Sequence, residues 1–145
     1  MQGLRRAFGE KNVQFDPDAD PTPGFKADVV VLVVGENPYA EMKGDSATLE
    51  LDGYDQWVFE QYTQDSTLSG VPLVTLVVSG RPLVMTAVLD RSVAVAELWL
   101  PGSEAGSVAE VLAGMVKPTA KLPHAWPSNA EQTKSVWPRG FGLTY

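Results

Sequence analysis

The sequence predicts an α/β domain in which helices cover both faces of a mostly parallel β-sheet, giving a three-layer αβα sandwich. Three nearly continuous apolar runs, residues 29–34, 73–78 and 93–100, are typical of strands that are buried on both faces. Helix-like segments alternate with these runs, and such alternation indicates an α/β fold. Glu97 interrupts the third run, which indicates an edge or a kink, and we expect one antiparallel strand at the edge of the sheet.

The chain before the first apolar run predicts an incomplete lead-in of helix and loop, residues 1–27. Apolar residues fall at helical spacing over residues 2–8, and Gly9 provides a stop. Residues 13–15 fit a short strand. Three prolines within residues 16–24 remove amide donors and fix backbone angles, so this stretch is expected to be a loop.

Two further helices are expected after the first and third apolar runs. Residues 52–68 place aromatic residues on one face, and Asp52 is positioned to cap this helix. A second helix follows Ser103, which is expected to cap it. Residues 118–145, with four prolines and two tryptophans, are expected to form an extended tail. The residues that fall on one face of each predicted helix are Tyr54, Trp57, Val58 and Tyr62 in the first, and Val108, Val111, Leu112 and Met115 in the second.

Composition limits the class of protein. A chain of 145 residues, 44% hydrophobic and 20% charged, is long enough for one globular domain, residues 1–145. Its net charge of -7 argues against nucleic acid and anionic membranes as partners. It contains no cysteine, and the first ten residues lack the apolar stretch of a signal peptide. We expect a soluble domain, and its compartment is unknown: cytoplasmic, or periplasmic or secreted if upstream sequence is missing.

The densest group of chemically useful residues follows the first apolar run. Residues 35–45, GENPYAEMKGD, contain the carboxylates Glu36, Glu41 and Asp45 together with Lys43. Charged side chains at the point where a strand ends do not contribute to the packing of the core. The loop is therefore the first candidate for chemistry.

The exits of all three apolar runs are expected to lie close together in space. The second run is followed by Ser-Gly-Arg-Pro at residues 79–82, and the third by Pro-Gly-Ser-Glu at residues 101–104. If the strands are parallel, these loops emerge along the carboxyl edge of the sheet, where open α/β sheets bind ligands.

The motifs, in order, resemble one family. GExPYxExxGD, SGRP at a strand end, WLPGSEAG opening a helix, KPTAKLP and the ending RGFGLTY are similar to the C-terminal α/β sandwich domain of glycoside hydrolase family 3, in β-glucosidases and exo-glucanases. The resemblance runs from residue 28 to the end of the chain. The segment AGMVKPTAKLP departs from the family pattern, having lost an aspartate and a glycine.

The resemblance implies a divided active site. In this family a (β/α)8 barrel carries an aspartate nucleophile, and the sandwich domain contributes the general acid/base glutamate, which matches Glu41 here. Glu36 would help to hold the loop. A barrel needs about 250 residues, so it cannot lie within this chain, and we expect the isolated domain to be inactive. The implied partners are a barrel domain and a β-glucoside or β-glucan substrate, with self-association possible through the exposed face that would dock on the barrel.

Other side chains have simpler interpretations. Glu36, Lys43 and Asp45 are the loop candidates for substrate binding, but we interpret them first as a scaffold of salt bridges and turns. Arg81 is interpreted as a structural arginine that bridges carbonyls or a carboxylate. His124 is the only histidine, so a metal site is not expected, and no cofactor is implied. Two alternatives to a catalytic domain stay open: a standalone carbohydrate-binding module, and a structural or assembly module.

Overall fold

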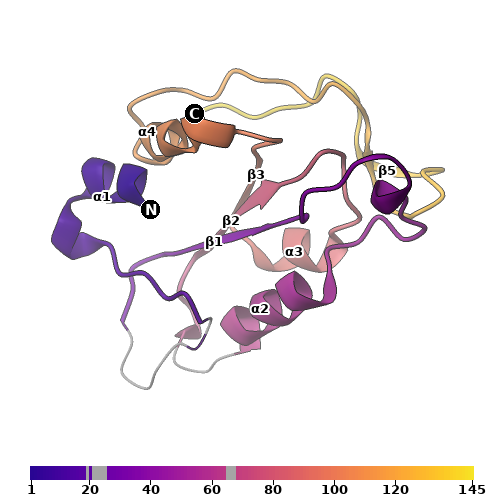
Figure 1. Ribbon diagram of the computed structural model, residues 1–145. Helices are drawn as coiled ribbons and strands as arrows, with labels where there is room; N and C mark the ends of the chain where they lie inside the picture. The colour runs from indigo at the N-terminus through magenta and orange to yellow at the C-terminus, as the bar shows by residue number, and fades with distance from the viewer. Residues whose placement is uncertain (19, 21–25, 65–67) are drawn as a thin grey trace.

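The central sheet contains three parallel strands, which confirms the predicted class (Figure 1). The computed structural model describes residues 1–18, 20, 26–64 and 68–145; parts of the predicted loop 16–24 and of the predicted helix 52–68 lie outside this set. The strands are β1 (Val30–Gly35), β2 (Leu73–Val78) and β3 (Ala94–Glu97), in that order across the sheet. β3 is shorter than the predicted run, because the chain leaves the sheet after Glu97.

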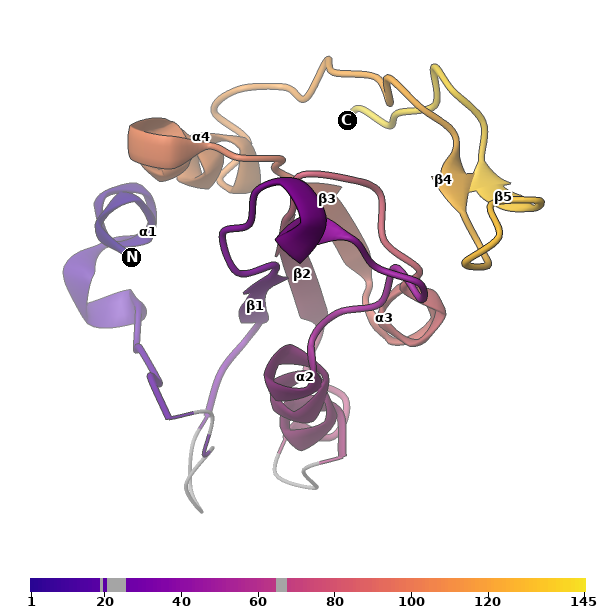
Figure 2. The same cartoon turned by 45° about the vertical axis from the view of Figure 1, so that its right-hand side comes forward.

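Helices lie on both sides of this sheet, so the three-layer arrangement is also confirmed. Helices α2 (Gly53–Gln64) and α3 (Thr86–Arg91) lie on one face, and α1 (Gln2–Phe8) and α4 (Val108–Leu112) on the other (Figures 1 and 2). The sequence did not predict α3, which is six residues long and follows the polar exit of β2. Short 3₁₀ helices complete the fold: η1 (Glu10–Asn12), η2 (Glu41–Gly44) and η4 (Gly102–Ser107).

The predicted helix ends are partly right. Asp52 caps α2, since its Oδ1 accepts the amide of Asp55 at 3.0 Å. Gly9 ends α1 with φ 91°, a positive value that glycine adopts without strain. The prediction for Ser103 was wrong: it lies inside η4, and its hydroxyl bonds the carboxylate of Glu104 at 3.2 Å instead of a backbone amide.

Among the described residues, antiparallel pairing occurs in the tail and not at the edge of the central sheet, where it was expected. β4 (Trp126–Pro127) and β5 (Ser135–Trp137) form a separate two-stranded ribbon, which lies beside the main sheet in Figure 2. Residues 13–15 form no strand, and Phe15 is 57% exposed. The predicted tail is extended but firmly anchored, because Trp126 is only 2% exposed.

The hydrophobic core lies between the sheet and the layer formed by α2 and α3. Alternate residues of β1 point into it, as period-two geometry requires: Leu32 and Val34 are buried, whereas Val33 is 55% exposed on the other face. Within the described ranges, no helix is long and apolar enough to cross a membrane. The core is made of Leu32, Val34, Leu51, Val58, Phe59, Leu73, Val77, Leu83, Met85, Val88 and Trp126.

Candidate functional site

The exits of the three parallel strands meet at one edge of the sheet, as predicted. Glu36, directly after β1, donates its amide to the carbonyl of Val78 at the end of β2 at 2.9 Å. Ser79, directly after β2, places its hydroxyl 3.2 Å from Glu97 Oε1 at the end of β3. The parallel register of the strands therefore brings together residues that are far apart in the sequence.

A largely buried ion pair joins the first two exits. Arg81 Nε and Nη2 both bind Glu36 Oε1, at 2.9 and 2.6 Å. The other oxygen of Glu36 accepts the Tyr39 hydroxyl at 2.9 Å and the Gly80 amide at 3.3 Å. Burial and the bond to Glu36 raise the pKa of Tyr39, so this phenol stays neutral and remains a donor. Glu36 is therefore a structural anchor, as the sequence indicated.

The same arginine also holds the candidate acid/base loop. Arg81 Nη1 donates to the carbonyl of Gly44, the last residue of η2, and its guanidinium lies 4.7 Å from the ring centroid of Tyr39. A side chain at Gly44 would collide with the ring of Tyr39, so this close approach requires glycine. The interpretation of Arg81 as a structural residue that bridges a carboxylate and a carbonyl is confirmed.

Glu41 lies at the start of η2 and outside this network. Its side chain is exposed, and its φ of 47° is unusual for a residue other than glycine. Such backbone strain is common at functional sites. The neighbouring Met42 is 83% exposed, which leaves an apolar side chain in solvent beside the carboxylate.

Lys43 and Asp45 do not contribute side chains to the scaffold. Both are exposed, and neither belongs to the two ion pairs found in the described part of the chain, which are Arg81–Glu36 and Arg5–Glu10. Asp45 contributes its backbone amide, which bonds the carbonyl of Met42 at 3.2 Å and closes the turn. The predicted salt-bridge role therefore holds for Glu36 and is wrong for Lys43 and Asp45, because their side chains lie in solvent rather than against Arg81.

Glu97 was not identified as a site residue from the sequence. Its Oε1 accepts the amide of Trp99 at 2.8 Å, and its Oε2 is buried. Burial raises the pKa of Glu97 to about 7, the nearby charge of Glu36 adds to the rise, and the bonds to Trp99 and Ser79 oppose it. A signal did exist in the sequence: a glutamate inside an apolar run must be neutralised or satisfied by its neighbours.

A hollow of about 460 Å³ opens next to Glu36, between the end of β1 and the start of α2. Within it, a carboxylate oxygen of Asp55 accepts the amide of Gly35 at 2.6 Å, and burial raises the pKa of Asp55 despite that bond. The rim carries Tyr54, whose ring lies 5.9 Å from that of Trp57. Both rings are well exposed, at 61% and 44%. The sequence places Tyr54 and Trp57 on the aromatic face of this helix, and their exposure makes them a surface feature.

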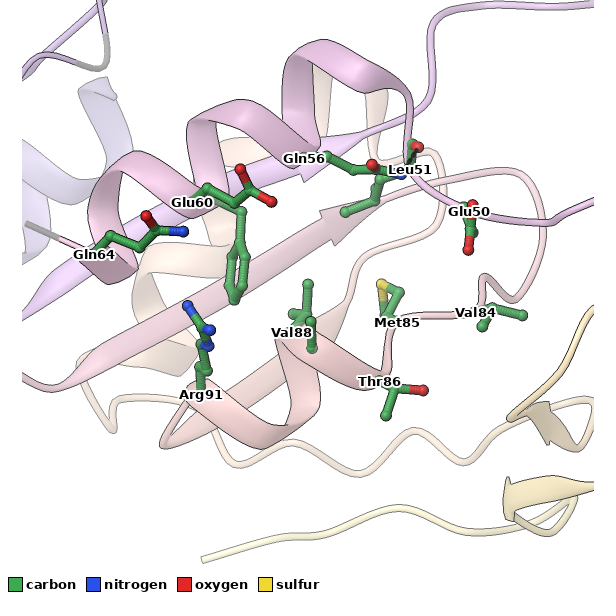
Figure 3. Close-up of a pocket in the computed structure, with 12 residues that line it drawn as sticks. Glu50, Leu51, Gln56, Glu60, Gln64, Val84, Met85, Thr86, Val88 and Arg91 are labelled. Carbon is green, nitrogen blue, oxygen red and sulfur yellow. Dashed lines mark hydrogen bonds between the residues drawn. The ribbon is translucent and has the colours of Figure 1, made fainter.

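A second pocket, of about 300 Å³, lies between α2 and α3 (Figure 3). Phe59, Met85 and Val88 form its apolar wall, and Glu60 and Arg91 stand at its rim. Its lining contains none of the predicted site residues. Among the residues that the structure describes, no group of three or more His, Asp or Glu side chains is placed to bind a metal ion.

The parallel α/β sheet gathers its strand exits, with the Glu41 loop among them, at one edge, which is where open α/β sheets bind ligands. Comparison with known proteins identifies the family. The whole chain, residues 1–145, matches the model of the glycosyl hydrolase family 3 C-terminal domain. The chain therefore belongs to glycoside hydrolase family 3, and the resemblance seen in its motifs is confirmed.

Individual relatives are similar over most of the chain. A lysosomal beta glucosidase of Dictyostelium discoideum is 38% identical over 103 residues, 70% of this chain and 12% of the relative. A beta-xylosidase of Formosa agariphila is 32% identical over 183 aligned positions, 100% of this chain and 25% of the relative. The crystal structure of an exo-1,3/1,4-beta-glucanase from a Pseudoalteromonas species matches with a TM-score of 0.75 and 34% identity, over 86% of this chain and 22% of that one. The chain thus spans a quarter or less of these relatives.

Proposed function

We propose that this domain supplies the general acid/base, Glu41, to a retaining β-glucosidase-like active site that a barrel domain outside these 145 residues completes. The observation that carries the proposal is the contrast within one loop. Its base is fixed by the contacts of Arg81 with Glu36 and Gly44, whereas its tip presents Glu41 and Met42 to solvent. A fixed base with an exposed tip suits a side chain that acts on a substrate held by another domain.

The chemistry requires two carboxyl groups. In a retaining hydrolase, a nucleophilic carboxylate and an acid/base lie about 5 Å apart on opposite sides of the glycosidic bond. Glu41 would first protonate the leaving oxygen while the barrel's aspartate forms the glycosyl-enzyme. It would then take a proton from the water that hydrolyses this intermediate. The exposed apolar side chain of Met42 would be covered when the barrel docks.

The experiment is an assay with an aryl β-glucoside, using this domain alone and mixed with a family 3 barrel domain. We expect activity only in the mixture, and a loss of about 10²- to 10⁴-fold in Glu41→Gln, the usual contribution of an acid/base. Glu110→Gln, which changes an exposed glutamate on α4, is the matched control. Activity in the mixture that survives Glu41→Gln would contradict the assignment.

A second candidate function is carbohydrate binding without catalysis, and the exposed pair Tyr54 and Trp57 favours it. Aromatic rings of this kind can pack against sugar faces, and polar groups of Asp52 and Asn37 stand beside the same hollow. Titration with a soluble β-glucan, followed by tryptophan fluorescence, tests this function. Saturable quenching that Trp57→Ala removes would support it, and no change at any concentration would count against it.

Self-association through the face that would dock on the barrel stays a prediction. We expect the isolated domain to form dimers whose dissociation depends on protein concentration. Met42→Ser should weaken them if the loop tip belongs to that face. Sedimentation equilibrium of the two proteins measures the difference.

A further inference from the structure

The hydroxyl of Ser79 stands between two acceptors and carries one proton. It lies 2.6 Å from the carbonyl oxygen of Arg81 and 3.2 Å from Glu97 Oε1. If Glu97 is a carboxylate, both neighbours are pure acceptors, and Ser79 can satisfy only one of them at a time. If Glu97 carries a proton, that proton can be donated to Ser79 Oγ while Ser79 donates to Arg81. Protonation of Glu97 therefore satisfies both contacts at once.

The surroundings of Glu97 also favour the protonated form. Its Oε2 is buried and has no hydrogen-bond partner among the residues that the structure describes, and an ionised oxygen in that position is costly. Burial accordingly raises the pKa of Glu97 to about 7. The proton count at Ser79 and the burial of Oε2 thus point to the same state.

The charged groups around Glu97 come from the two neighbouring strand exits. Glu36, after β1, faces it and disfavours a second negative charge. Arg81, after β2, already gives two of its nitrogens to Glu36 and the third to Gly44. The amide of Trp99, two residues further along the chain, opposes the rise in pKa by bonding Oε1, and the contacts with Ser79 oppose it as well.

We propose that Glu97 is a positioning residue for the Glu41 loop: while it is protonated, Ser79 is free to fix the Arg81 carbonyl, and the guanidinium of Arg81 then holds Gly44. The contacts form one continuous path from the end of β3 to the end of η2. The inference rests on the proposed role of Glu41, but the path itself can be tested without any catalysis. Ionisation of Glu97 draws the Ser79 proton toward its own carboxylate and frees the Arg81 turn.

Glu97 has a second contact that matters for a spectroscopic test. Trp99 is held at φ 53°, an outlier for a bulky residue, and its amide bonds Glu97 Oε1 at 2.8 Å. A change in the charge of Glu97 must therefore alter the Trp99 amide directly. That amide reports the protonation of Glu97, while the amides of Gly44 and Asp45 report its effect on the loop.

The experiment is a pH titration of the ¹⁵N-labelled chain, followed by NMR between about pH 5.5 and 8.5. In the wild type, the amides of Trp99, Gly44 and Asp45 should shift together with one midpoint near the pKa of Glu97. Glu97→Gln keeps the shape of the side chain and does not titrate, so it should abolish all three shifts. Glu110→Gln should leave the titration unchanged.

Ser79→Ala distinguishes an effect that is transmitted to the Glu41 loop from the direct effect of the charge on Glu97. In this variant Trp99 should still titrate, whereas Gly44 and Asp45 should lose their shifts because the path is cut. Titration at Gly44 that persists in Glu97→Gln or in Ser79→Ala would overturn the proposal. In Glu41→Gln the coupled titration should persist, so a failed acid/base assignment and a failed positioning role give different results.

Discussion

Two nitrogens of the Arg81 guanidinium, Nε and Nη2, bind a single oxygen of Glu36, at 2.9 and 2.6 Å. The two side chains are 26% and 11% exposed, so the pair is largely removed from water. It joins residues that are 45 positions apart and ties the exits of β1 and β2 together. Because the third nitrogen holds Gly44, one side chain connects the sheet to the loop that carries Glu41.

Removal of Arg81 should loosen this loop and destabilise the domain. Arg81→Ala leaves Glu36 partly buried without its cation, and we expect a loss of about 2 kcal/mol in the free energy of unfolding. Arg81→Lys keeps the charge but cannot reach Glu36 and Gly44 together, so it should restore only part of the loss. Urea unfolding measures both. Arg139→Ala, at an exposed site, should change stability by less than about 0.5 kcal/mol, and an equal loss there would contradict the assignment.

Gly44 and Gly53 form a matched pair for testing the close approach of Tyr39. A Cβ at Gly44 would collide with the Tyr39 ring, whereas a Cβ at Gly53 would meet nothing within 4 Å. Gly44→Ala should displace Tyr39 from Glu36 and cost about 1 to 2 kcal/mol. Gly53→Ala, in the first turn of α2, should be neutral or stabilising by up to about 1 kcal/mol. Thermal unfolding compares the two, and similar effects would show that the Tyr39 contact is unimportant.

Stability should fall as pH rises toward neutrality, because of Glu97. Its pKa is about 7 in the folded chain and near the ordinary 4.5 when unfolded. Between these values the folded state binds more protons than the unfolded state, so each rise in pH favours unfolding. We expect a loss on the order of 1 to 2 kcal/mol between about pH 5 and 8, after allowing for partial exposure.

Glu97→Gln should flatten this pH dependence, since an amide does not titrate. Above about pH 7 the variant should be as stable as the wild type or more so. Unfolding by urea at a series of pH values provides the comparison. Asp55, whose pKa is also raised, contributes a residual slope of the same sign in both proteins. An unchanged slope in the variant would assign the effect to other groups.

The sequence was a good guide to the sheet because long-range geometry followed from local pattern. Apolar runs marked β1 and β2 within one residue, and parallel strands required their exits to meet at one edge. That argument predicted that the loops that contain Glu36 and Arg81 are neighbours, and the two side chains form an ion pair. The sequence also predicted that Asp52 caps α2, because the hydrogen bond of a helix cap spans only three residues.

Other features depend on contacts that a one-dimensional pattern does not contain. The buried environment of Glu97 is built by Ser79 and Trp99, and its unusual proton affinity follows from that environment. The positive φ of Glu41, at the start of η2, is likewise a feature of the folded loop that no sequence pattern marks. The exposure of Trp57 did not follow from the sequence, because helical periodicity identifies an apolar face but not what covers it.

The burial of Trp126 predicts that the tail is part of the core. Its ring is 2% exposed and lies 6.5 Å from Trp99 and 6.4 Å from Trp137, which in turn stacks on Phe141 at 5.1 Å. Trp126→Ala should therefore cost about 3 to 5 kcal/mol. It should also make the tail the first part of the chain to be cut in limited proteolysis.

Trp126→Phe distinguishes packing from hydrogen bonding at this position. The indole Nε1 is buried without a partner among the described residues, so phenylalanine removes a costly donor while it leaves a smaller cavity than alanine does. The two effects oppose each other, and we expect a loss of less than about 2 kcal/mol. Leu143→Ala, at a site that is 75% exposed, should have almost no effect. Trp126→Phe could prove as damaging as Trp126→Ala. In that case the indole N–H must bind a group that compensates its burial, and Trp126 would stabilise the fold through that bond rather than through packing.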